Sequence, residues 1–170
     1  MVRAMSTNDK NQLSLFEASN GVTLLHKFGR VTTRLVRETS DEYERVQVSS
    51  PADVADFLHE YFRNKDREEF LIVLLNTANV VEDMAVVSVG GLAASIVEPR
   101  QVFKTAVLAN AAAIVCAHNH PSGNPEPSRE DIRITRQLVE AGKLMGIPIH
   151  DHLIIAGTTY TSLAERGLMP

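Results

Sequence analysis

The sequence has no tryptophan and a single cysteine, Cys116, among its 170 residues. One cysteine cannot form an internal disulfide, so a secreted fold held together by disulfides is excluded and a reducing compartment is indicated. Aromatic residues make up only 5% of the chain, so its core is expected to be aliphatic. The length fits one domain with additional residues at one end.

The chain also lacks long apolar runs and an excess of basic residues. No run approaches the roughly 20 apolar residues that span a bilayer, and the N-terminal residues lack the apolar core of a secretion signal. We therefore expect a soluble, cytoplasmic protein. The formal net charge is −4, which argues against a surface dedicated to nucleic acid because phosphate binding requires a basic face.

The first 42 residues differ from the rest and predict an N-terminal tail or arm ahead of a domain over residues 43–170. Residues 1–50 hold seven basic and six acidic side chains, whereas residues 51–170 hold ten and fifteen. One interpretation is a partly ordered tail with solvated charges. The other is an arm that docks on a partner or on nucleic acid.

Within the domain, helical and strand patterns alternate. Residues 44–48 could form an edge strand, and residues 51–64 predict a helix that Ser50 caps and Pro51 opens. Further strands are expected in 68–77, 80–91, 112–118, 150–157 and 158–163, and further helices in 99–112 and 128–146. This pattern predicts an α/β or α+β domain, with a mixed sheet flanked by helices.

Four polar residues follow the apolar strand that ends near residue 118. His118 and His120 are two apart, so on an extended segment both side chains point to the same side. Asp131 lies in the first turn of the next helix, beyond a loop rich in Pro and Gly. Two His and one carboxylate leave a fourth tetrahedral position open, as in catalytic zinc sites. The alternative is that Ser128 and Asp131 only form a capping box.

The string HNHPSGNPEPSRED resembles the JAMM metalloprotease motif, also called MPN+ or JAB, H-x-H-x(7)-S-x(2)-D. His118, His120, Ser128 and Asp131 meet every spacing. Residues 99–132, DHLII and SLAERGL are similar to the RadC branch of that family, and the resemblance covers about residues 45–170. It implies a JAB/MPN-like fold with cytidine-deaminase-like architecture. Because the chain is too short for the helix-hairpin-helix region of full-length RadC proteins, a short stand-alone member is expected.

The resemblance also implies roles for these residues. His118, His120 and Asp131 would hold one Zn²⁺ per chain, and Ser128 would hydrogen-bond the developing oxyanion. The family's general base is a glutamate on a strand well before the histidines. Glu69, directly before the apolar run FLIVLL, fits best; its neighbour Glu68 is the alternative, because strand alternation lets only one of them face the site.

The function implied is that of a zinc metallopeptidase that cleaves an amide bond in a peptide or a protein conjugate. One alternative is a DNA-repair-associated or DNA-binding accessory protein, as the RadC branch has been labelled; the acidic composition gives it little support. The other is a non-catalytic scaffold, for which a missing His or Asp would be expected. Neither the substrate nor the oligomeric state can be inferred from the sequence.

Overall fold

The computed structural model describes residues 31–36, 46–90 and 97–170. The chain divides into two units, Met1–Arg34 and Leu35–Pro170, and all helices and strands described below belong to the second. The predicted boundary between residues 42 and 43 lies outside the described residues. Residues 31–36 are exposed and form neither helix nor strand.

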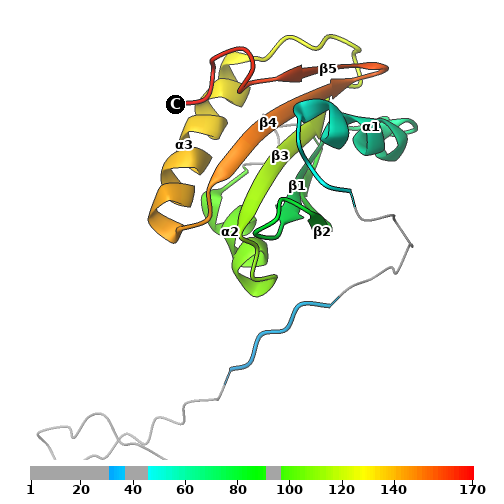
Figure 1. The fold of residues 1–170 in the computed structure, drawn as a ribbon. Helices are drawn as coiled ribbons and strands as arrows, with labels where there is room; N and C mark the ends of the chain where they lie inside the picture. The colour runs from blue at the N-terminus through cyan, green and yellow to red at the C-terminus, as the bar shows by residue number, and fades with distance from the viewer. Residues whose placement is uncertain (1–30, 37–45, 91–96) are drawn as a thin grey trace, which may run out of the picture. The chain divides into compact units, whose positions relative to one another are not determined.

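The apolar runs of the sequence become the central strands of one sheet (Figure 1). Five strands are hydrogen-bonded in the order β2-β1-β3-β4-β5. Only β3 and β4 are parallel, and the other neighbours are antiparallel. The strands are β1 Glu69–Leu75, β2 Val81–Val89, β3 Ala113–Asn119, β4 Ile149–Ala156 and β5 Thr159–Ser162.

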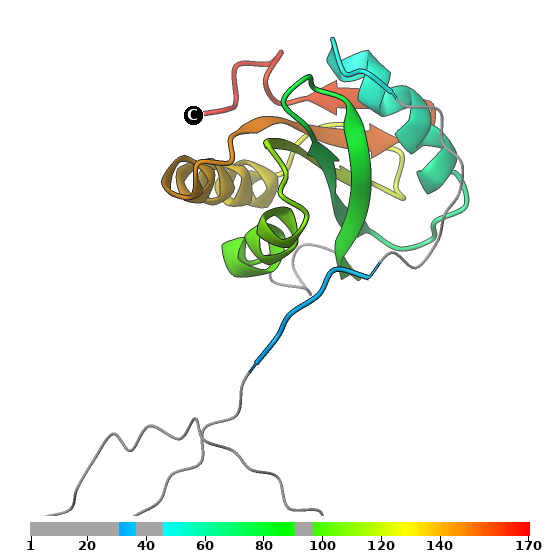
Figure 2. The same ribbon diagram turned by 60° about the horizontal axis from the view of Figure 1, so that its bottom comes forward.

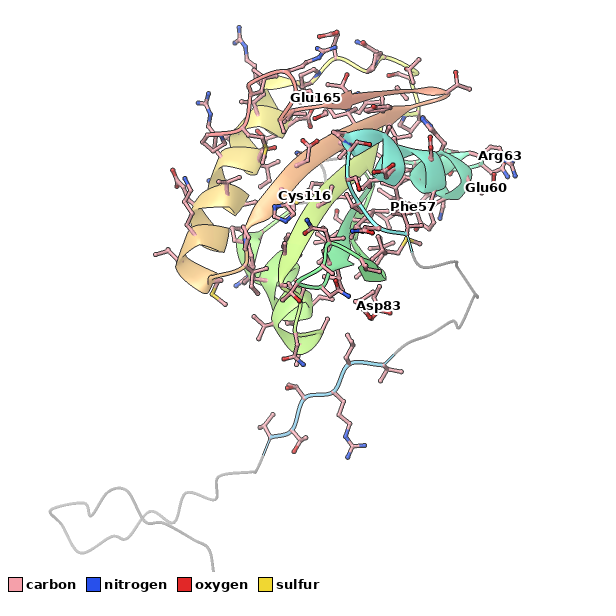
Figure 3. The ribbon with its side chains drawn as sticks, in the orientation of Figure 1. Phe57, Glu60, Arg63, Asp83, Cys116 and Glu165 are labelled. Carbon is pink, nitrogen blue, oxygen red and sulfur yellow. The ribbon has the colours of Figure 1, made fainter. Side chains whose placement is uncertain are left out.

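Helices cover both faces of this sheet (Figure 2). Helix α1, Pro51–Phe62, packs on one face, while α2, Pro99–Leu108, and α3, Arg129–Met145, pack on the other. The inner strands β1 and β3 are buried at every position, because both of their faces contact helices. Cys116 lies in the middle of β3 (Figure 3), buried on the α2–α3 face.

The predicted fold class, a mixed sheet flanked by helices, is confirmed, and every predicted helix and strand from residue 51 onward has its counterpart. The edge strand expected at residues 44–48 is reduced to one isolated bridge, Gln47 to Val80; residues 44 and 45 lie outside the described part. None of the helices in the described part is long and apolar enough to cross a membrane.

The crossover from β3 through α3 to β4 brings the predicted site together. The carboxyl end of β3 and the amino end of α3 are joined by residues 120–128 and lie on the α2–α3 face of the sheet. Beside β3, the antiparallel strand β1 begins where β3 ends, with Phe70 opposite His118. Polar residues at these three element ends therefore meet in one region.

Candidate metal centre

The two histidines stand where β3 leaves the sheet. His118 is fully buried on β3, and His120 follows the strand with its N–H donating to the carbonyl of Ile155 on β4 at 2.8 Å. This last ladder bond keeps the segment extended, so both imidazoles reach the same side. Their Nε2 atoms lie 3.0 Å apart.

Asp131 comes to the same point from α3. Ser128 caps the helix: its Oγ accepts a hydrogen bond from the N–H of Asp131 at 3.1 Å, and its own N–H donates to Asp131 Oδ2 at 2.6 Å. The predicted capping box is therefore present. It fixes the Asp131 carboxylate so that Oδ2 is used by the cap while Oδ1 faces His118 Nε2 at 3.3 Å.

Two observations indicate that this group of side chains fits a metal ion. First, Asp131 is fully buried, and its Oδ1 has no hydrogen-bond partner among the described residues, which is costly for a buried carboxylate unless a cation lies nearby. Second, nitrogens bound to zinc at about 2.0–2.1 Å in tetrahedral geometry lie roughly 3.3 Å apart. The two nitrogens lie 3.0 Å apart, and His118 Nε2 lies 3.3 Å from Asp131 Oδ1, so both separations are close to that spacing.

The far nitrogens of both rings are also engaged. His120 Nδ1 lies 2.7 Å from the carbonyl of Asn124. Since a carbonyl only accepts, Nδ1 carries a proton, which leaves Nε2 as the ring nitrogen that can bind a metal ion. His118 Nδ1 lies 2.8 Å from Nε2 of His152. Burial, with a smaller contribution from His120, lowers the pKa of His118 from 6.5 to about 3. His118 is therefore neutral at pH 7, as a ligand must be.

The structure brings Glu68, and not the predicted Glu69, to this group. Ligand atoms of Glu68, His118, His120 and Asp131 all lie within 4.8 Å of one another. Phe70 pairs with His118, so by alternation the side chain two residues earlier shares the face of the histidines.

Glu69 points to the opposite face, toward α1. Its Oε2 accepts a hydrogen bond from the Tyr61 hydroxyl at 2.9 Å, and its Oε1 lies 3.0 Å from Lys65 Nζ. The expectation that Glu69 faces the metal-binding group is therefore wrong, and Glu68 occupies that place. The error arose because both faces of β1 are buried, so the sequence showed no alternation from which to choose.

Asn119, between the two histidines, fixes the backbone on both sides of Glu68. Its Oδ1 accepts from the N–H of Glu69 at 2.7 Å, and its Nδ2 donates to the carbonyl of Arg67 at 2.9 Å. This side chain extends the β1–β3 pairing past the end of β3. The Glu68 carboxylate is thereby held on the side of the metal centre.

Ser128 is exposed beside the group. Because its Oγ acts as an acceptor in the cap, the hydroxyl hydrogen stays available for donation. Its predicted role toward an oxyanion is compatible with this arrangement, and stays a prediction.

The sequence did not point to Thr135, which the structure places beside His152 of β4. Thr135 lies one turn after Asp131 on the same side of α3, a spacing that could have drawn attention to it. His152 is fully buried on β4, where it pairs with Cys116. Only the three-dimensional packing of β3, β4 and α3 brings these groups together.

Comparison with known proteins agrees with this geometry. The sequence model of the RadC-like JAB domain matches residues 48–168. A UPF0758 protein of Salinibacter ruber is 62% identical over 136 residues, covering 80% of this chain and 58% of the relative. The UPF0758 protein BH3032 of Halalkalibacterium halodurans is 47% identical over 132 residues, covering 78% and 57%.

A UPF0758 protein of Methanosarcina acetivorans is 40% identical over 176 residues, covering 98% of this chain and 76% of the relative. The chain thus spans somewhat more than half the length of the first two relatives. The family model covers the strands, helices and metal-binding group described above. The chain therefore belongs to the RadC-like JAB domain family, whose fold is of the metallohydrolase type.

Proposed function

We propose that this chain is a zinc-dependent hydrolase that cleaves an amide bond of a peptide or of a protein conjugate. The observation that carries the proposal is the buried Asp131 Oδ1, which has no hydrogen-bond partner among the described residues and lies beside two imidazole Nε2 atoms and the Glu68 carboxylate. A group of this kind is costly without a cation and has the composition of a catalytic metal site.

His118 and His120 would bind the ion through Nε2, and Asp131 through Oδ1. Two nitrogens and one oxygen favour zinc and leave a fourth position for water or substrate, although iron and manganese also accept such ligands. When bound, the ion would lower the pKa of water and polarise the substrate carbonyl. An orphaned carboxylate oxygen is the feature of this chain that such an ion would satisfy.

The remaining steps fall to Glu68 and Ser128. The Glu68 carboxylate accepts a proton from the attacking water and donates it to the nitrogen of the leaving amine. The Ser128 hydroxyl donates a hydrogen bond to the oxygen of the scissile carbonyl as negative charge develops on it. A single donor of this kind contributes about 3–4 kcal/mol in well-studied enzymes.

The neighbouring glutamates give a matched test. Glu68→Gln should keep zinc and lower the rate of amine release about 10²–10⁴-fold, the usual contribution of a general base. Glu69→Gln, one residue away on the other face, should keep most of the activity. The assay follows amine release from pools of peptides and isopeptide conjugates.

If Glu68→Gln and Glu69→Gln lose rate to the same extent, the proposal that Glu68 is the general base is contradicted. No release by zinc-loaded wild type above the Glu68→Gln background, on any pool, would count against an amide hydrolase.

A further inference from the structure

A continuous chain of hydrogen bonds runs behind the metal-binding group, from α3 through β4 to β3. Thr135 Oγ1 lies 2.6 Å from the backbone carbonyl oxygen of Asp131 and 2.5 Å from His152 Nδ1. His152 Nε2 lies 2.8 Å from His118 Nδ1. Thr135, His152 and His118 are each at most 1% exposed, so these contacts are shielded from bulk water. This chain of hydrogen bonds begins at Asp131 and ends at His118, which are both metal-binding residues.

The donor and acceptor of every hydrogen bond in this series follow from the first bond, between Thr135 and the carbonyl of Asp131. A carbonyl oxygen can only accept, so the Thr135 hydroxyl donates its one hydrogen to the carbonyl of Asp131. Thr135 Oγ1 can then only accept from His152, which must carry its proton on Nδ1. Because a fully buried imidazole is neutral, its Nε2 has no proton.

The same reasoning fixes His118. The bare Nε2 of His152 accepts a hydrogen bond, so His118 donates from Nδ1. His118 is itself neutral and buried, and its Nε2 is therefore left with a free lone pair. That lone pair points into the group that contains Asp131 Oδ1 and His120 Nε2.

We propose that Thr135 and His152 are positioning residues that set the proton on His118 Nδ1 and keep Nε2 bare for the metal ion. This inference rests on the proposed metal site and names two residues that determine its state. The opposite tautomer would place an Nε2–H 3.3 Å from Asp131 Oδ1, where it would hydrogen-bond the carboxylate and close the site. The chain of hydrogen bonds prevents that closure in the metal-free protein.

Packing holds the two rings in the orientation that this chain requires. Phe70 stacks on His118 with ring centroids 6.2 Å apart, and it meets His152 edge-on at 5.3 Å. Phe70 is itself buried, so it packs against both imidazoles inside the core. The orientation of the imidazoles is therefore fixed by β1 as well as by the hydrogen bonds.

The first test uses the unaltered protein, stripped of metal with a chelator. Long-range ¹H–¹⁵N NMR spectra of the imidazoles report which ring nitrogen carries the proton. We expect His118 and His152 both to be protonated on Nδ1 at pH 7, with assignments taken from single His→Gln variants. Protonation of either ring on Nε2 would overturn the proposal.

The second test compares Thr135→Val with Thr135→Ser. The valine variant keeps the shape but removes the acceptor for His152 Nδ1, so both histidines should move their protons to Nε2. Zinc affinity, measured by competition with a chromophoric chelator, should fall about 10–100-fold, as for other residues that orient metal ligands. The serine variant restores the hydroxyl and should restore the tautomers and the affinity.

Unchanged tautomers and unchanged zinc affinity in a folded Thr135→Val protein would also overturn the proposal. Neither the tautomers nor the zinc affinity depends on turnover. Failure of the positioning proposal can therefore be told apart from failure of the hydrolase proposal. Zinc binding and the Nδ1–H tautomers without hydrolysis would leave the positioning role intact. Hydrolysis with Nε2–H tautomers would overturn the positioning role alone.

Discussion

Asp131 combines two tasks at one position of α3. Its Oδ2 completes the helix cap with the N–H of Ser128, and its Oδ1 faces a bare imidazole nitrogen without any donor between them. The first task stabilises the fold. The second task has a cost when no cation is bound. Asp131 Oδ1 and His118 Nε2 are then two hydrogen-bond acceptors that face each other in a buried site, which is unfavourable in free energy.

Replacing Asp131 with Asn should separate these tasks. The amide oxygen can still accept from Ser128 N–H, while the amide NH₂ can donate to His118 Nε2. We expect the metal-free variant to be more stable than metal-free wild type by about 1–3 kcal/mol, the cost of an unsatisfied buried group. It should also lose zinc binding. Urea unfolding with chelator present measures the first effect, and elemental analysis measures the second.

Asp53 supplies the matched control, because it occupies the same capping position in α1 and accepts from the N–H of Ser50 at 2.7 Å. Asp53 does not belong to the metal-binding group found among the described residues. Asp53→Asn should therefore lower stability slightly, through loss of a negative charge at a helix N-terminus. A loss of metal-free stability in Asp131→Asn as large as in Asp53→Asn would contradict this account of Oδ1.

At the scale of elements, the alignment of β1 with β3 decides which glutamate reaches the centre. The Asn119 side chain provides the last two hydrogen bonds of that alignment, to Glu69 N and to the carbonyl of Arg67. Asn119→Ala should therefore release the backbone around Glu68. We expect turnover to fall by at least about tenfold, since misplacing a catalytic group by 1 Å can cost 10²-fold, with zinc content unchanged.

Asn76, at the opposite end of β1, offers the control for this variant. Its Oδ1 accepts from the N–H groups of Ala78 and Val80 in the turn that leads to β2. Asn76→Ala should cost a similar amount of stability, about 1–3 kcal/mol, and leave turnover intact. If both variants lose turnover alike, the effect of Asn119 is one of stability and not of alignment.

The sequence predicted most elements because their signals are local. Apolar runs marked β1 and β3, and Pro51 and Ser128 marked the starts of two helices that the structure confirms. The spacing of the histidines, Ser128 and Asp131 could be read directly, and the structure brings these residues together.

What the sequence could not supply depends on contacts between elements. Choosing Glu68 over Glu69 requires knowing that α1 covers one face of β1 while α3 and the histidines lie on the other. The support from Thr135 and His152 requires the packing of α3 against β4. No local pattern carries either piece of information.

At the scale of the whole molecule, the candidate centre joins segments that are far apart in the chain. Glu68 directly precedes β1, His118 is the last residue but one of β3, and Asp131 lies in the first turn of α3. An ion bound by His118, His120 and Asp131 connects the end of β3 with the start of α3 in the folded state only, so zinc should stabilise the domain by mass action. The DNA-associated and scaffold interpretations require no such ion, and so they predict no coupling between metal and stability.

The most direct test is the zinc content of the purified wild type beside Asp131→Asn, by elemental mass spectrometry, with thermal unfolding of each before and after chelation. We predict about one zinc per wild-type chain, a midpoint of unfolding that falls when zinc is removed, and neither zinc nor a chelator effect in the variant. A wild-type protein that takes up no metal when zinc is offered, and whose unfolding is the same with and without chelator, would contradict the metal centre.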